Sequence, residues 1–131
     1  MPDVTAVEIE GLEGFYNGLF LKARSALGVT SFGLAVVEIE AGSDPHPLHD
    51  HESEGQEEVY VVLRGSGSME IEGGGPIALD QNTLVRVGPT TKRKITPGPD
   101  GVRLLSIGGI PGKPYEAPGY SEVGAPDPLA S

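Results

Sequence analysis

The chain has 131 residues, which fits one domain with one hydrophobic core, and 37% of them are apolar. Its formal net charge is −10 and its only basic cluster is Lys92-Arg93-Lys94, which disfavours nucleic acid and anionic membrane surfaces as partners. It contains no cysteine, so disulfides and thiolate metal sites are excluded, and no signal peptide or membrane-spanning apolar run is visible. We therefore expect a cytoplasmic protein.

Short apolar runs separated by glycine and proline predict many short strands. Residues 4–9 and 18–23 are weaker strand candidates, and residues 24–27 are consistent with one helical turn. Residues 32–40 give the clearest alternation, and the glycine-containing segment at 41–45 ends it. Further strands are predicted at 59–63, 68–72, 77–79, 83–87, 93–96 and 102–107, with turns at 64–67, 73–76 and 97–101.

No stretch sustains a helical period over ten or more residues. Strands spaced about ten residues apart and joined by turns favour an all-β protein with an antiparallel sandwich or barrel. The tail from Pro111 onward is rich in proline and glycine, lacks periodicity, and is expected to be extended or disordered at its end. The predicted core residues are Phe32, Leu34, Val36, Val62, Met69, Ile71, Leu84, Val85, Leu104 and Ile107.

All three histidines of the chain fall within six residues, at His46, His49 and His51. In an extended segment, His49 and His51 point to the same side, where two imidazoles are suited to chelating one metal ion. His46 stands between two prolines at an odd separation from His49, so we expect it to line a loop near the site. An alternative reading is that such a pair is an ordinary set of surface histidines.

A divalent cation also needs a negative ligand, and carboxylates follow the histidines closely. Glu57 and Glu58 stand at the head of the strand predicted at 59–63, and alternation cannot choose between them, because both faces of this strand are apolar further on. Asp50, Glu52 and Glu54 are additional oxygen donors in the loop, with less fixed positions. The residues thus predict a divalent metal site with two histidines and one carboxylate.

The order Gly42, His49-Asp50-His51, Glu58 and Gly65 resembles the first motif of the cupin superfamily, which runs Gly, His-any-His, Glu, six residues, Gly. The six residues between Glu58 and Gly65 select Glu58 over Glu57 as the ligand. Residues 79–89 resemble the start of the second motif, and the resemblance covers about residues 30–110. It implies an antiparallel jelly-roll (cupin) barrel at residues 30–110, preceded by N-terminal strands or an arm at 1–29 and followed by the tail at 111–131.

The sequence departs from the cupin pattern in three places. The loop between His51 and Glu58 is longer than usual by about two or three residues, and the glycine of the second motif is replaced near Gln81. The histidine of the second motif, normally the fourth ligand, is missing, and Arg93, or alternatively Lys92, occupies its neighbourhood. Two histidines and one glutamate can still hold zinc, iron, manganese or nickel with positions left open.

An arginine cannot ligate a metal, because its guanidinium stays charged and has no lone pair to offer. If Arg93 points inward, it can anchor a carboxylate ligand, or it can pair with Glu58 and leave the site without metal; alternatively, residues 92–94 form a solvated strand face. Tyr60 lies two residues after Glu58 and so on the same face, where it can line the pocket or belong to the core.

These residues lead to three hypotheses of function. The first is a small-molecule-binding cupin with a divalent metal site at His49, His51 and Glu58, with Arg93, Tyr60 and His46 as pocket residues. The second is a metal-dependent oxygenase or isomerase acting on a small organic acid. The third is a metal-free structural cupin in which Glu58 pairs with Arg93. A homodimer is expected in each case, partly because cupins often dimerise and partly because open strand edges invite pairing.

Overall fold

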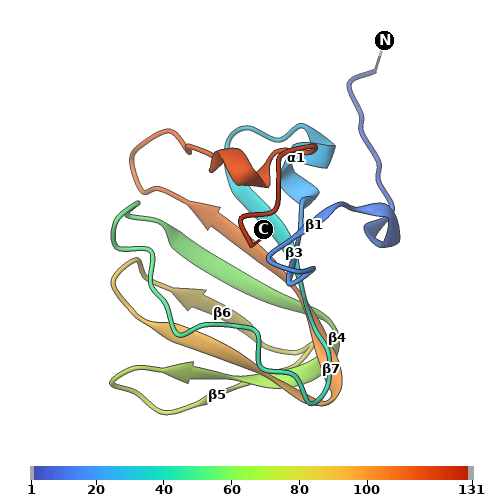
Figure 1. The fold of residues 1–131 in the computed structure, drawn as a ribbon. Helices are drawn as coiled ribbons and strands as arrows, with labels where there is room; N and C mark the ends of the chain where they lie inside the picture. The colour runs from blue at the N-terminus through green and yellow to red at the C-terminus, as the bar shows by residue number, and fades with distance from the viewer. Residues whose placement is uncertain (1, 130–131) are drawn as a thin grey trace.

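A computed structural model describes residues 2–129. Its elements follow the chain in this order: η1 (Ile9–Gly11), β1 (Gly14–Phe15), β2 (Phe20–Leu21), α1 (Ala23–Leu27), β3 (Gly33–Ile39), β4 (Glu57–Ile71), β5 (Ile77–Leu79), β6 (Leu84–Val87), β7 (Arg93–Gly109) and η2 (Gly119–Ser121). The structure is thus all-β apart from single helical turns, as the sequence predicts (Figure 1). Within the described residues, no helix has the length and apolar character needed to cross a bilayer.

The strands form an antiparallel sheet in the order β1-β2-β3-β7-β4-β5, with β6 also paired to β4. The first half of β4 lies between β6 and β7, because Glu58 is opposite both Val87 and Gly108. The second half of β4 lies between β5 and β7. β4 thus pairs with three strands, and Glu58 near its start has a paired strand on each side.

β4 and β7 are longer than predicted, because each continues through a segment that the sequence marks as a turn. The register shifts twice in β4, between Val62 and Arg64 and again between Gly65 and Gly67. Gly65 has φ +75°, and a Cβ placed there would lie 2.1 Å from the carbonyl oxygen of Gly101. The glycines of the predicted turn at 64–67 therefore form β-bulges that bend paired strands instead of ending them.

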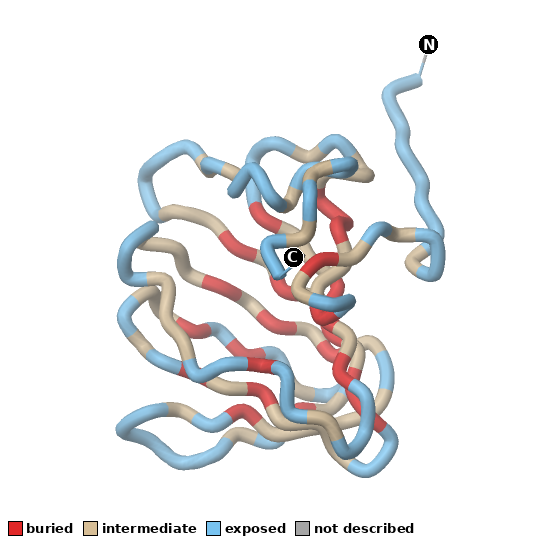
Figure 2. The backbone as a smooth tube through the Cα atoms, viewed as in Figure 1, coloured by how far each residue is buried: buried red, intermediate tan, exposed pale blue. Residues whose placement is uncertain are grey.

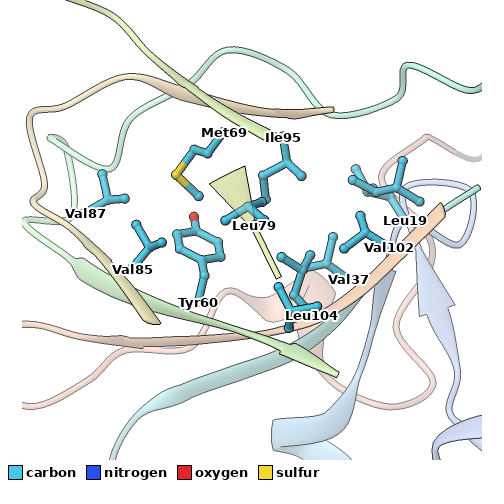
Figure 3. Close-up of a cluster of buried hydrophobic side chains, with 12 residues drawn as sticks. Leu19, Val37, Tyr60, Met69, Leu79, Val85, Val87, Ile95, Val102 and Leu104 are labelled. Atoms are coloured by element: carbon cyan, nitrogen blue, oxygen red, sulfur yellow. The ribbon is translucent and has the colours of Figure 1, made fainter. Parts of the chain in front are cut away.

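The hydrophobic core lies between the strands, and buried positions alternate with exposed ones along β6 (Figure 2). Its members include Val37, Tyr60, Met69, Leu79, Val85, Ile95 and Leu104 (Figure 3). Two predicted core residues are wrong: Leu84 is 73% exposed and Phe32 is 40% exposed. Leu84 and Val85 are adjacent in β6, so they face opposite sides and only Val85 points inward. Phe32 precedes β3 and takes no part in its pairing.

The N-terminal segment differs from its prediction. Residues 4–9 form no strand: the chain from Pro2 to Glu8 is exposed and extended, and it leads into the single turn η1 (Figure 1). Within the predicted strand at 18–23, only Phe20–Leu21 pairs in the sheet, because α1 already begins at Ala23.

The tail packs onto its own chain through charged and polar contacts with the N-terminal segment. Lys22 is 2% exposed, and its ammonium donates to the Glu13 carboxylate and to the carbonyl oxygens of Glu122 and Ala125, at 2.8 and 3.0 Å. The Asp127 carboxylate accepts 3.0 Å hydrogen bonds from the backbone N–H groups of two consecutive residues after β1. The described tail residues are therefore held against β1 and α1 (Figure 1).

Candidate metal centre

The loop between β3 and β4 carries the histidines along the start of β7. His49 exchanges two backbone hydrogen bonds with Arg93, of 3.0 and 2.9 Å, and the backbone N–H of His51 donates to the carbonyl oxygen of Pro89 at 3.0 Å. The segment is thus extended and paired at His49, although it is not a regular strand. The two imidazole centroids lie 5.0 Å apart, as expected for side chains on one side of an extended chain.

Each of these two imidazoles has one nitrogen engaged by an acceptor. Nδ1 of His49 lies 3.0 Å from the carbonyl oxygen of Pro47, and Nδ1 of His51 lies 3.1 Å from the carboxylate of Glu54. A proton on each Nδ1 leaves the Nε2 lone pair of the neutral ring free for a metal ion. Such outer hydrogen bonds are the usual way in which metal-binding histidines are oriented.

Glu58 is 7% exposed and its carboxylate is surrounded by polar groups. Oε1 accepts hydrogen bonds from the Tyr60 hydroxyl at 2.5 Å and the Arg93 guanidinium at 2.6 Å, and lies 3.2 Å from Nε2 of His51. Oε2 accepts from Gln56 Nε2 at 3.2 Å and from the hydroxyl of Ser106 on β7 at 3.1 Å. The carboxylate is therefore held in one orientation by side chains of β4, of β7 and of the loop before β4.

Arg93 is completely buried, although the sequence places it between two lysines. Besides the bond to Glu58, its Nε donates to the Tyr60 hydroxyl at 3.2 Å and its Nη1 to the carbonyl oxygen of Thr91 at 2.8 Å. Arg93 thus points inward and forms the pair with Glu58 on which the metal-free hypothesis depends. All three guanidinium nitrogens already donate within the protein, and Arg93 is not among the residues that line the cavity described below.

The same contacts determine the charge states of the site. Burial alone would raise the pKa of Glu58, but the hydrogen bonds and charges of His51, Tyr60 and Arg93 hold it well below its usual range. Burial opposes protonation of His51, yet the neighbouring Glu58 carboxylate raises its pKa, whereas burial lowers the pKa of His49. Burial also raises the pKa of Tyr60, so its phenol stays protonated and donates to Glu58.

His46 lies beside the site, but its Nδ1 accepts a hydrogen bond, whereas Nδ1 of His49 and of His51 faces an acceptor. It is 2% exposed, its ring centroid is 5.0 Å from that of His49, and its Nδ1 accepts the backbone N–H of Ile95 at 3.0 Å. Burial lowers the pKa of His46 to about 3, so the ring is neutral near neutral pH. A neutral ring that accepts at Nδ1 carries its proton on Nε2, and this nitrogen then has no lone pair for a metal ion.

The site opens into a cavity of about 1040 Å³. His46, His49, His51, Glu58 and Tyr60 line one end. The remaining walls come largely from β1, β2, β3 and the tail, with the side chains of Phe15, Tyr16, Leu19, Phe20, Leu34, Tyr115, Tyr120 and Leu129. The cavity is large enough for a small organic molecule in contact with the histidines and Glu58.

The donor set fits a divalent metal ion. One nitrogen each from His49 and His51 and one oxygen from Glu58 all lie within 4.8 Å of one another. Two ligand atoms bound about 2.1 Å from one ion lie about 3.0–3.4 Å apart at tetrahedral or octahedral angles, and the 3.2 Å between His51 Nε2 and Glu58 Oε1 matches this spacing. The Arg93 guanidinium opposes a cation here, since it already neutralises Glu58.

Comparison with known proteins identifies the fold. No protein-family model and no curated protein matches the sequence. Among solved structures, a cupin protein from Bacteroides fragilis is 22% identical with a TM-score of 0.69, over 90% of this chain and 93% of that one. A cupin-superfamily sugar phosphate isomerase from Silicibacter pomeroyi is 16% identical with a TM-score of 0.65, over 80% and 75% of the two chains. A DMSP lyase from Ruegeria pomeroyi is 19% identical with a TM-score of 0.59, over 91% and 62%.

These likenesses, together with the strand order, show that the chain is a small domain with the cupin jelly-roll fold. The resemblance of its first motif to the cupin pattern is thus confirmed at the level of the fold. The sequence also identifies the three side chains that the structure brings together, His49, His51 and Glu58.

Sequence reasoning misses the groups that orient these side chains. Gln56, Ser106 and the role of Glu54 as an acceptor for His51 carry no motif signal. Ser106 is distant in the sequence, and only the pairing of β4 with β7, which places it opposite Tyr60, brings it to Glu58.

Proposed function

We propose that this chain is a small-molecule-binding cupin that holds a divalent metal ion with His49, His51 and Glu58. The observation that carries the proposal is the orientation of the two imidazoles. Nε2 of His51 lies 3.2 Å from the Glu58 carboxylate, a ring nitrogen of His49 lies within 4.8 Å of both, and Nδ1 of each ring has an acceptor outside the cluster. Ordinary surface histidines have no reason to converge on one buried carboxylate in this way.

A metal ion bound here would act as a Lewis acid and polarise an oxygen of a bound molecule. The protein residues have separate roles. Glu54 and the carbonyl oxygen of Pro47 orient the rings, and Tyr60, Gln56 and Ser106 fix the Glu58 carboxylate. The cavity beside the cluster encloses the body of the bound molecule.

The test is elemental analysis of untagged protein purified without chelator, followed by calorimetric titration with zinc, manganese, iron(II) and nickel salts. Wild-type protein should bind one ion per chain, and the His49→Ala/His51→Ala variant should bind none. Asp50→Asn is the matched control, because it removes a carboxylate from the same loop outside the cluster and should leave binding unchanged. No binding to wild-type protein at millimolar metal would contradict the proposal.

A second candidate is a metal-free cupin, which the buried pair between Arg93 and Glu58 favours. With a 2.6 Å ion pair and the Tyr60 hydroxyl on the same oxygen, Glu58 is already neutralised and hydrogen-bonded. The titration above separates the two candidates, since only the first predicts one ion per chain.

We also retain the homodimer as a proposal. Among the described strands, β6 pairs only with β4, and its outer positions include Leu84, which is 73% exposed. An open edge with an exposed leucine is suited to contact with a second copy. Light scattering after size exclusion should give twice the chain mass, and a monomeric mass at micromolar concentration would contradict the proposal.

A further inference from the structure

His46 is a buried hydrogen-bond donor that no protein group uses. Its Nδ1 accepts from the backbone N–H of Ile95, so Nε2 carries the proton. No protein acceptor contacts Nε2 in the described part of the chain. The only enclosed side-chain nitrogen or oxygen without a partner there is Nε of Arg24, so Nε2 of His46 is not enclosed and reaches the cavity that its ring lines.

The position of His46 is fixed from several directions. It stands between Pro45 and Pro47, which restrict the backbone on both sides, and its carbonyl oxygen accepts from the Lys94 ammonium at 2.8 Å. The ring is therefore held with a neutral N–H directed at the cavity next to His49. A donor fixed before binding loses little entropy when an acceptor arrives.

The charge of the loaded site favours an anion as the acceptor. Glu58 and Arg93 form a buried pair whose charges cancel. A divalent ion on two neutral imidazoles and this carboxylate would then leave about two positive charges, and the Glu54 carboxylate beside His51 would offset about one of them. A carboxylate on the bound molecule would offset part of that charge, and it has enough lone pairs to accept from His46 as well.

Part of the cavity wall is aromatic. Phe15, Tyr16, Phe20 and Tyr120, which we call the aromatic wall, have neighbouring ring centroids 5.3–5.8 Å apart, and all four line the cavity. Tyr120 comes from the tail and the other three from the segment around β1 and β2. Such a wall suits a bound molecule with an apolar or aromatic body.

We propose that the cavity binds a monocarboxylic acid with an apolar body, and that His46 is a specificity-determining residue whose Nε2–H donates to the carboxylate while the body packs against the aromatic wall. This inference rests on the proposed metal site. The metal and His46 would hold the same carboxylate from two sides, so His46 selects an oxygen acceptor without ligating the ion.

The experiment measures calorimetric binding of 3-phenylpropionate, phenylacetate and hexanoate to metal-loaded protein. Two variants separate the two nitrogens of His46. In His46→Asn the amide oxygen replaces Nδ1 as the acceptor for Ile95 and the donor is lost, whereas in His46→Gln the amide nitrogen replaces Nε2 and the donor is kept. Loss of a hydrogen bond to a charged group predicts a roughly ten- to hundredfold weaker affinity for His46→Asn. His46→Gln should stay within about threefold of wild type by the same reasoning.

Two further comparisons test the ligand class. The neutral analogue 3-phenylpropanamide should bind at least about tenfold more weakly than 3-phenylpropionate, because it lacks the charge. Tyr120→Ala should weaken 3-phenylpropionate but leave propionate nearly unchanged, since propionate has no phenyl ring to pack against the aromatic wall. Circular dichroism and the metal stoichiometry of every variant are recorded on the same samples.

The outcomes are distinguishable. If wild-type protein binds no metal, both the proposed function and this inference are overturned. If metal binds with one ion per chain but none of the three acids binds at millimolar concentration, or His46→Asn binds them as well as wild type does, only the inference fails. If His46→Asn keeps its metal and its fold but loses the acids, the inference stands.

Discussion

A metal ion at the proposed site would compete with the Arg93 guanidinium for the Glu58 carboxylate, and the substitution Arg93→Met tests this competition. Arg93 is 0% exposed, and its guanidinium donates to Glu58, to Tyr60 and to the carbonyl oxygen of Thr91. Methionine keeps much of the unbranched stem but removes the charge and every donor. In the metal-free variant, Glu58 is then a buried carboxylate without its permanently charged partner.

The expected cost is large. Removing one partner of a buried ion pair typically destabilises a protein by about 3–5 kcal/mol. For a domain of this size, about 4 °C of melting temperature corresponds to each kcal/mol, so the variant should melt about 12–20 °C lower. Arg86→Met is the matched control: Arg86 pairs with Glu57 at 2.8 Å, but its side chain is 63% exposed. Exposed pairs contribute less than about 1 kcal/mol.

A metal ion should stabilise the Arg93→Met variant more than the wild-type protein. With the guanidinium gone, the ion no longer meets a buried positive charge, and we expect at least about tenfold tighter binding in Arg93→Met than in wild type, as electrostatic repulsion over a few ångströms implies. At a free concentration about a hundred times the dissociation constant, binding adds about 2.7 kcal/mol of stability. Urea unfolding with and without zinc measures both effects.

Two results would refute this reasoning. A metal-free Arg93→Met variant as stable as the Arg86→Met control would show that the buried pair contributes little. Unchanged or weaker zinc binding would show that Arg93 positions Glu58 for the ion rather than opposing it.

Three other predictions follow from the fold and the site. Gly65→Ala should lower the free energy of unfolding, measured with urea, by about 1–3 kcal/mol or more beyond the loss caused by Gly73→Ala. Both residues have positive φ, but a Cβ at Gly65 alone of the two would lie 2.1 Å from a backbone oxygen. Equal losses in the two variants would contradict this close approach. Lys22→Met should speed amide hydrogen exchange in the tail and make the tail more sensitive to proteases. Lys113→Met, an exposed control on the tail, should change neither property. Unchanged exchange in both variants would contradict the role of Lys22 in holding the tail. Burial lowers the pKa of His46 in the folded state from 6.5 to about 3. Below about pH 6.5 the unfolded chain therefore binds a proton at His46 that the folded chain does not bind, and the free energy of unfolding decreases as the pH is lowered. Between about pH 6 and 4.5 the unfolding free energy of His46→Asn should therefore depend on pH less steeply than that of wild type by up to about 1.4 kcal/mol per pH unit, and parallel curves would contradict it.

The sequence predicts the parts of the molecule that depend on local order. Spacing and residue type predict the pair His49 and His51, because the extended backbone brings residues two apart to one side, and the resemblance to the first cupin motif selects Glu58 over Glu57. The same periodicity locates the strands, including β5 at its observed bounds. The sequence does not predict that β4 and β7 continue through the segments around Gly65 and Pro97, because these residue types are normally found in turns. Only the pairing of the two strands shows that the chain stays in the sheet there.

The inward direction of Arg93 could not be predicted from the residues. Its neighbours on both sides are lysines, so alternation gives no preference, and the deciding contacts come from Glu58 and Tyr60 on another strand. The aromatic wall has the same origin. Tyr120 meets Phe15 and Tyr16 only because Lys22 and Asp127 join two segments that are about a hundred residues apart in the sequence.

The contact between tail and N-terminal segment has a consequence for the order of folding events. The hydrogen bond from the Tyr16 backbone to Asp127 joins residues 111 positions apart, and closing so long a loop is unfavourable until the strands have paired. The tail is attached by hydrogen bonds, ion pairs and the ring of Tyr120 but pairs with no strand, and such a segment opens more readily than the paired strands of the core. Docking of the tail should thus be the last folding step and the first to reverse. A transient form with an undocked tail would keep His49, His51 and Glu58 together on the sheet but lose Tyr120 from the cavity, so the release of a bound acid could be timed by local opening of the tail.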